Sequence, residues 1–146
     1  QWSGGKNAGF TDGKPWMKVN PNYKEINAAQ QIKDANSVFC CYQKLIRLRK
    51  KYPVFINGDF RLLLADDENI FAYIREDADS QLIVICNFYD KTVRCPLEEP
   101  DASTEQLISN YKDTDWTGIL RPYEATMYLK RKDFRTGFPQ KELDET

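Results

Sequence analysis

The sequence predicts an α+β fold, in which a loop and one long helix precede an antiparallel β-sandwich domain. The helix is indicated by residues 37–52, SVFCCYQKLIRLRKKY, where Val38, Tyr42 and Leu45 recur at the three- and four-residue spacing of an amphipathic helix. The sandwich is indicated by residues 54–132, where short β-branched and aromatic runs are separated by turn residues, roughly every eight to twelve positions.

Residues 1–36 are too often interrupted by glycine and proline to form a long helix or strand. Large aromatic side chains at Trp2, Phe10, Trp16 and Tyr23 argue against disorder. Two interpretations stay open from residue types alone: a loop held by aromatic anchors, or a loop that borders a binding site. Residues 28–32 are expected to add a short helical turn.

The helix has clear signals at both ends. Asn36 and Ser37 are N-cap candidates, and Pro53 prevents continuation. Basic residues gather in the last turns, where the helix dipole favours them; they are Arg47, Arg49, Lys50 and Lys51. The apolar stripe is expected to pack on the β-domain or on a second copy of the chain, so self-association is one expectation.

Six strands are expected after the helix, at residues 60–64, 70–75, 81–89, 91–97, 105–111 and 124–131. The alternation around Phe60 and Leu62 predicts a half-buried strand. Residues 81–89, QLIVICNFY, are almost continuously β-branched or aromatic, which predicts a central strand covered on both faces. Residues 133–146 lack periodicity and are expected to form a tail.

Four cysteines leave the disulfide question open. A two-residue hairpin loop at Asp90 and Lys91 would place Cys86 opposite Cys95. A pair of buried thiols in a reducing compartment is the alternative, and it is favoured over a disulfide. Cys40 and Cys41 are adjacent on the helix and suit neither a mutual bridge nor a shared metal.

Composition excludes several function classes. The net charge of −1 gives no reason to expect nucleic acid as a partner, and no apolar run reaches the roughly 20 residues of a membrane helix. The chain has no histidine, so it offers neither a Ser-His-Asp arrangement nor the usual zinc or haem ligands. No glycine-rich phosphate loop occurs. We therefore expect no metal, no cofactor and no catalysis by this chain alone.

Several short motifs occur in one order: Gln1-Trp2, residues 7–11 (NAGFT), Pro15-Trp16, residues 19–23 (VNPNY) and Ile26-Asn27. Together with the helix and the closing residues 122–129 (PYEATMYL), they resemble the late part of the α-glucosidase and oligo-1,6-glucosidase branch of the α-amylase superfamily. Trehalose-6-phosphate hydrolases, dextran glucosidases and sucrose isomerases are similar in these motifs.

The resemblance implies a (β/α)₈ barrel followed by an antiparallel β-domain. It makes residues 1–53 the remnant of the catalytic barrel, with its last loop and last helix, residues 54–132 the C-terminal β-domain, and residues 133–146 a tail. Since barrel active sites lie among the βα loops, the first region would border the catalytic mouth. The expected chain is thus a fragment of a longer cytoplasmic enzyme.

The family hydrolyses α-glucosidic bonds with retention, using an Asp nucleophile, a Glu acid/base and a stabilising Asp. No position here matches these residues, and an arginine that normally precedes Gln1 is also missing, so no catalytic residue is carried over. The resemblance makes Gln1, Asn7 and Phe10 substrate-proximal candidates, beside the alternative that they only hold the loop. The partners it implies are an oligosaccharide and the catalytic barrel.

Three alternatives remain. One is a stand-alone carbohydrate-binding β-sandwich, with Trp2, Trp16 and Trp116 as sugar platforms, which requires exposed, coplanar aromatics on one face. Another is a fragment of a trehalose-6-phosphate hydrolase. The last is a non-catalytic relative, such as the barrel-like ectodomain of an amino-acid transporter subunit.

Overall fold

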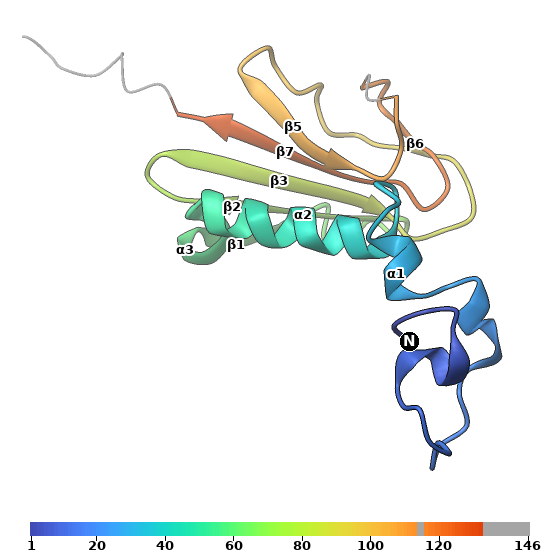
Figure 1. The fold of residues 1–146 in the computed structure, drawn as a ribbon. Coiled ribbons are helices and arrows are strands. Elements are labelled where there is room, and N and C mark those ends of the chain that lie inside the picture. The colour runs from blue at the N-terminus through green and yellow to red at the C-terminus, as the bar shows by residue number, and fades with distance from the viewer. Residues whose placement is uncertain (114–115, 133–146) are drawn as a thin grey trace, which may run out of the picture. The chain divides into compact units, whose positions relative to one another are not determined.

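A computed structural model describes residues 1–113 and 116–132. The chain divides into two compact units, Gln1–Lys51 and a second unit that begins at Tyr52. Figure 1 shows helices and turns in the first unit and strands in the second. None of the helices in the described part is long and apolar enough to cross a membrane.

The first unit contains two 3₁₀ turns, η1 (Lys6–Gly9) and η2 (Pro21–Lys24), and two helices, α1 (Ala28–Gln31) and α2 (Val38–Lys51). The short turn predicted at residues 28–32 is confirmed as α1, which begins because the Asn27 side chain accepts a hydrogen bond from Gln30 N at 3.0 Å. The predicted long helix is confirmed as α2.

Ser37 is the residue that starts α2. Its Oγ accepts a hydrogen bond from Cys40 N at 3.1 Å and donates one to the Gln31 carbonyl at 2.7 Å. The Gln31 side chain accepts another from Phe39 N at 3.2 Å. These bonds satisfy amide groups that the first turn of a helix leaves without partners. They also fix α1 to the start of α2.

The apolar surface of α2 is largely open. None of its residues is buried, and Val38 and Tyr42 are 65% and 64% exposed. The packing of this apolar stripe on the β-domain or on a second copy of the chain therefore remains a prediction. A hollow of about 410 Å³ lies along this surface; its lining residues are Gln31, Val38, Phe39, Tyr42, Gln43 and Ile46.

Among its described residues, the second unit is built from two antiparallel sheets and one short helix, α3 (Val54–Asn57). The larger sheet has the order β1-β2-β3-β7-β5, and β4 pairs with β6 in the smaller one. Its strands are β1 (Asp59–Leu63), β2 (Ile70–Glu76), β3 (Ser80–Asn87), β7 (Ala125–Arg131) and β5 (Thr104–Ser109). The smaller sheet consists of β4 (Val93–Arg94) and β6 (Ile119–Leu120). The prediction that residues 81–89 form a central strand is confirmed by β3.

A hydrophobic core joins the two sheets. The larger sheet contributes Ile70, Ala72, Ile85 and Tyr128, and the β4–β6 side contributes Val93, Cys95 and Leu120. Trp116 packs edge-on against Tyr128, with ring centroids 6.2 Å apart. The described strands therefore form the antiparallel sandwich that the sequence predicts.

The other face of the larger sheet is also partly covered. Leu82 and Leu129, paired across β3 and β7, are each 1% exposed. Arg75 of β2 fixes α3 to this sheet, because its guanidinium donates to the carbonyls of Val54, Ile56 and Gly58 at 3.2, 3.2 and 2.7 Å. A Cβ at Gly58 would lie 2.7 Å from the Val54 oxygen, so this close approach requires glycine.

The hairpin predicted around Asp90 is wrong. Cys86 pairs with Phe71 of β2 and Ala125 of β7, and the strand predicted at 91–97 is only β4, which pairs with β6. The chain leaves the larger sheet after Asn87, so Cys86 is not opposite Cys95. All four cysteines are free thiols.

Strand β1 is less buried than its alternating sequence predicts. It lies at an edge of the sheet, and Phe60 and Leu62 are 57% and 43% exposed. The predicted tail at residues 133–146 lies outside the described residues.

Candidate functional site

Gln1 fixes the start of the first unit to its second 3₁₀ turn. Its side-chain amide donates to Asn22 Oδ1 at 2.9 Å and to the Ile26 carbonyl, and its own carbonyl accepts from Ala28 N at 3.0 Å. Both amide hydrogens therefore have partners inside the loop. In this geometry Gln1 holds the segment together.

Asn7 and Ala8 shape the loop through an uncommon backbone. They have φ values of 51° and 54°, and Gly9 follows at 77°. Asn7 Nδ2 donates to the carbonyls of Thr11 and Gly13, each at 2.8 Å. Left-handed backbone at a residue other than glycine is strained and tends to occur at functional sites.

Ala8 is the buried centre of this turn. It is fully inaccessible, and its carbonyl accepts from Trp2 N at 2.9 Å and Ser3 N at 3.1 Å. The turn brings residues 2 and 3 against residue 8. The loop therefore has a defined shape, although almost no apolar side chain is buried in it.

Phe10 is the predicted site residue whose side chain is open to a ligand, at 57% exposed. Other exposed apolar side chains of the same unit are Trp2, Trp16 and Met17. The carboxylates of residues 1–36 are Asp12, Glu25 and Asp34, all exposed. Retaining hydrolysis of a glycoside needs two carboxyl groups about 5 Å apart.

Trp116 does not present a flat, open face to a sugar ring. It is half-buried and lies at 84° to the Tyr128 ring. The neighbouring exposed rings of the β-unit, Phe71 and Phe88, are tilted by 31° to each other. Among these rings of the second unit, the described residues therefore do not show the exposed coplanar platform that a stand-alone binding module requires.

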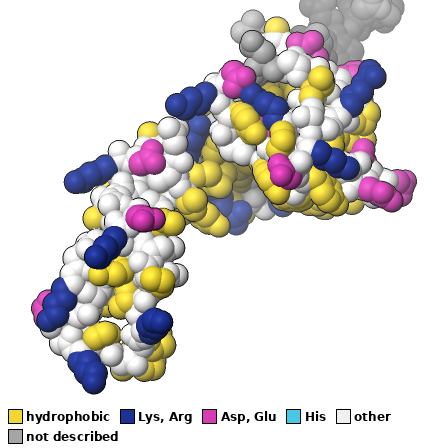
Figure 2. All heavy atoms as spheres, turned by 90° about the vertical axis from the view of Figure 1, so that its right-hand side faces the viewer, with side chains coloured by type: hydrophobic (Ala, Val, Ile, Leu, Met, Phe, Trp, Pro, Cys, Tyr) yellow, Lys and Arg dark blue, Asp and Glu magenta, His cyan; other side chains and the backbone are white. Residues whose placement is uncertain are grey.

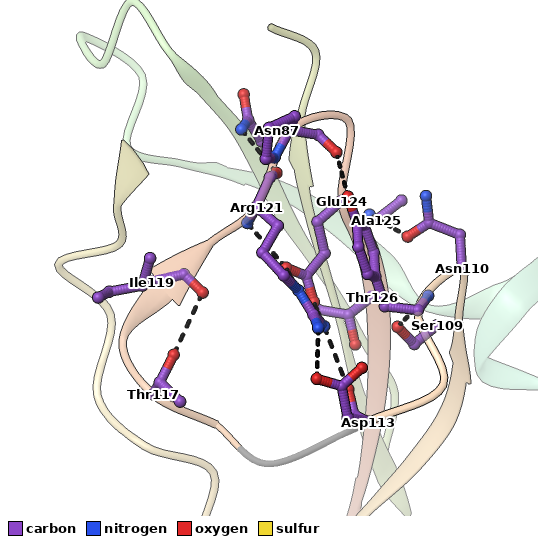
Figure 3. A network of polar contacts seen from close by, with 12 residues as sticks. Asn87, Ser109, Asn110, Asp113, Thr117, Ile119, Arg121, Glu124, Ala125 and Thr126 are labelled. Carbon is purple, nitrogen blue, oxygen red and sulfur yellow. Dashed lines mark hydrogen bonds and ion pairs between the residues drawn. The ribbon is translucent and has the colours of Figure 1, made fainter. Parts of the chain in front are cut away.

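A polar network at the start of β7 was missed by sequence reasoning (Figure 3). Arg121 pairs with Asp113 at 2.6 Å and with Glu124 at 2.8 Å, and its guanidinium lies 3.8 Å from the centre of the Tyr111 ring. The three-residue spacing between Arg121 and Glu124 was its only local sequence signal.

Asn87 is the buried centre of the same region. Its Nδ2 donates to the carbonyls of Lys91 at 2.7 Å and Arg121 at 2.8 Å, and its Oδ1 accepts from Tyr89 N at 3.0 Å. Each polar atom of this side chain therefore has a partner in the protein. Asn87 holds a corner of the sandwich.

Hydrogen bonds from Arg121 stabilise the ionised forms of the two carboxylates in this network, Glu124 and Asp113. Burial raises the pKa of Glu124, but hydrogen bonds from Arg121 outweigh burial and leave that pKa below its ordinary 4.5. Hydrogen bonding from Arg121 also lowers the pKa of Asp113. Within residues 1–113 and 116–132, no group of three His, Cys, Asp or Glu side chains could hold a metal ion.

Two family models match this chain. Residues 1–58 match the α-amylase catalytic domain, and residues 70–127 match the C-terminal domain of the α-amylase SusG. The first match covers the loop and α2, and the second covers most of the sandwich. The chain is thus similar to the C-terminal part of α-glucosidases of the α-amylase superfamily.

Its similar relatives agree with this assignment. The chain is 47% identical to an oligo-1,6-glucosidase of Halalkalibacterium halodurans, over 91% of this chain and 25% of that enzyme. It is 43% identical to a trehalose-6-phosphate hydrolase of Bacillus subtilis, over 90% and 25%. A crystal structure of the Bacillus licheniformis trehalose-6-phosphate hydrolase matches with a TM-score of 0.81 and 40% identity, over 90% and 25%. The chain thus spans about a quarter of the relatives it matches.

Proposed function

We propose that this chain is the C-terminal part of a retaining α-glucosidase that hydrolyses α-glucosidic bonds of short oligosaccharides. The observation that carries the proposal is the 47% identity to an oligo-1,6-glucosidase across both units of the chain. In the whole enzyme the catalytic acids come from the preceding barrel. The chain alone is inactive, because it has no matching nucleophile or acid/base.

The two units have different roles in this proposal. Residues 1–53 are the last loop and helix of the barrel, and residues 54–132 are a supporting β-domain. Phe10 borders the substrate, since its side chain is exposed, whereas Gln1 and Asn7 hold the loop through their amides. The open surface of α2 supports a barrel partner, because apolar helix faces are normally packed.

We place the enzyme in the cytoplasm and in carbohydrate metabolism. A second candidate function is hydrolysis of trehalose 6-phosphate. The 43% identity to one such enzyme and the structural match to another support it. The two candidates share the bond type and the retaining chemistry, and they differ in the sugar that leaves.

A hybrid enzyme tests whether this chain can complete an α-glucosidase. This chain would replace the matching quarter of the H. halodurans oligo-1,6-glucosidase, and glucose release would be followed from an α-1,6-linked disaccharide and from trehalose 6-phosphate. We expect hydrolysis of the disaccharide. A folded hybrid that cleaves neither sugar contradicts the proposal, and so does release of p-nitrophenol from p-nitrophenyl α-glucoside by this chain alone.

The role of Phe10 can be measured in the same hybrid. Phe10→Ala should raise KM, because it removes an exposed ring from the substrate's side of the loop. Ile26→Ala is the matched control, at a position 49% exposed in the same unit, and should leave KM unchanged. Equal effects of the two variants would remove Phe10 from the site.

A further inference from the structure

The start of the chain forms a loop that is held almost entirely by hydrogen bonds. It comprises residues 1–13 and is named here the N-terminal loop. It exposes Trp2 and Phe10, at 64% and 57%, and buries only Ala8. Figure 2 shows hydrophobic side chains beside charged ones at the surface of this part of the chain, in the lower part of the view. Because the loop buries little apolar surface, hydrogen bonds must set the position of Phe10.

Phe10 is held through the turn that precedes it. The Ala8 carbonyl accepts hydrogen bonds from Trp2 N at 2.9 Å and from Ser3 N at 3.1 Å. Gly9 follows with a φ of 77°, and a Cβ there would lie 3.1 Å from Ser3 Oγ and 3.2 Å from Trp2 Cβ. The turn is therefore packed tightly on residues 2 and 3, so a shift of those two residues moves Phe10.

Residues 1 and 2 are in turn held by the first amides of α1. Ala28 N donates to the Gln1 carbonyl and Ala29 N donates to the Trp2 carbonyl, each at 3.0 Å. The first amides of a helix have no partner within that helix, so they are available to hold another segment. The position of the N-terminal loop therefore depends on the position and direction of α1.

Asn27 fixes the start of α1. Its Oδ1 accepts from Gln30 N at 3.0 Å, and its Nδ2 donates to the Tyr23 carbonyl at 2.9 Å. The side chain is 2% exposed, and a Cβ at Gly4 would lie 3.8 Å from Asn27 Nδ2. One buried carboxamide thus joins α1 to η2, and the backbone of the N-terminal loop passes close beside it.

We propose that Asn27 is a positioning residue for the substrate, and that it acts through the orientation of Phe10. This inference rests on the proposed function, in which Phe10 borders the substrate. A path of hydrogen bonds leads from Asn27 to the start of α1, then to residues 1 and 2, and then to the turn before Phe10. A loop that is fixed in this way loses less conformational entropy when the substrate binds, so binding is tighter.

Hydrogen exchange in the 146-residue chain tests the hydrogen-bond path. Asn27→Ser keeps a hydroxyl that can cap α1, but the shorter side chain cannot also reach the Tyr23 carbonyl. We expect the amides of Ser3 and Phe10 to exchange faster by roughly fivefold or more, measured by NMR. The amides of the central strand β3 should keep their wild-type rates, which shows that the variant folds. Unchanged exchange at Ser3 and Phe10 would overturn the inference.

Kinetics of the hybrid enzyme test the consequence for the substrate. Asn27→Ser should raise KM for the α-1,6-linked disaccharide by roughly fivefold and leave kcat nearly unchanged. A residue that only supports folding would instead lower the amount of active enzyme, and therefore kcat, without changing KM. Asn36→Ser is the matched control, since Asn36 is exposed in the same unit, and should leave KM unchanged.

A double-mutant cycle shows whether Asn27 acts through Phe10. Phe10→Ala and the double variant with Asn27→Ser should have the same KM, because the ring that Asn27 positions is already absent. If the two increases in KM multiply instead, Asn27 does not act through Phe10, and the inference is overturned while the proposed function stands.

Failure of the proposed function would look different. A folded hybrid with wild-type residues at these positions that cleaves neither sugar counts against the function. The exchange rates in the 146-residue chain then decide the path from Asn27 to Phe10 without any activity. Faster exchange of Ser3 and Phe10 supports that path, and unchanged exchange overturns it.

Discussion

The two units of this chain are each stabilised by a different kind of interaction. Among residues 1–51, all of which the structure describes, only Ala8, Asn27 and Ser37 are buried, and two of these are polar. The second unit buries a cluster of large apolar side chains between two sheets. The first unit is thus shaped by hydrogen bonds within its loops, and the second by a hydrophobic core.

This difference predicts how each unit responds to mutation. Hydrogen bonds between exposed groups contribute little to stability, whereas apolar burial contributes strongly. Core substitutions should lower the free energy of unfolding of the β-unit. Substitutions in the first unit should change its local structure and leave the β-unit unaffected.

The largest effect is expected from Leu120→Ala. Leu120 is 1% exposed in the core cluster, and its truncation should lower the free energy of unfolding by about 3 kcal/mol. Urea unfolding of a chain that also carries Trp2→Phe and Trp16→Phe, followed by the fluorescence of Trp116, which packs on Tyr128, measures this. Ile119→Ala, at the exposed neighbouring position, should cost less than about 0.5 kcal/mol. Similar costs at the two positions would contradict the assigned core.

The next largest effect is expected from Glu124→Gln, about 2 kcal/mol at pH 7, because it weakens three hydrogen bonds to Arg121. The pKa of Glu124 is lowered in the folded state, so its stabilisation is present above the ordinary pKa of 4.5 and is lost as the pH falls through the lower folded value. The wild type and the variant should therefore converge in stability under acid conditions. A difference that stays constant down to pH 2 would rule out the charged pair as its source.

A smaller, local effect is expected from Asn27→Ala. Asn27 is 2% exposed, and its side chain bonds to Gln30 N at 3.0 Å and the Tyr23 carbonyl at 2.9 Å. Its loss should raise amide exchange around α1 by a local cost of about 1.5 kcal/mol. Asn36→Ala, at an exposed position, is the control. The unfolding midpoint reported by Trp116 should not move, and a shift there would mean that the two units unfold together.

The smallest effect is expected from Ser37→Ala, which removes the N-cap of α2. The cost should be about 1 kcal/mol of helix stability, seen as faster amide exchange of Cys40. Ser37→Asp should restore protection, because aspartate is also a good N-cap. Failure of Ser37→Asp to do so would show that the bond from Ser37 to the Gln31 carbonyl matters more than the cap.

The sequence predicted the elements of this fold better than their pairing. The apolar run at 81–89 identified β3 as the central strand, and Ser37 was identifiable as a cap from its position before an amphipathic run. The hairpin around Asp90 that would have placed Cys86 opposite Cys95 was wrong, because a loop-length argument considers only neighbouring strands, whereas the favoured alternative of free thiols is confirmed. The Asn87 side chain bonds to the Arg121 carbonyl, 34 residues away, and such contacts leave no local pattern.

Only part of the candidate site could be predicted from the sequence. The motifs around Gln1, Asn7 and Phe10 identified the family, but not what each side chain does. Gln1 and Asn7 donate to backbone carbonyls of the loop, and those bonds depend on the path of the chain. The left-handed backbone at Ala8 could not be foreseen either, since alanine rarely adopts it.

Arg75 binds three backbone carbonyls of the short segment before β1, those of Val54, Ile56 and Gly58. A lysine ammonium could not span these acceptors, because it lacks the planar fork of a guanidinium. A mechanical load applied through residue 52 would therefore meet this anchor before it reached β1. In a pulling experiment, Arg75→Lys should lower the force at which the sheet begins to open.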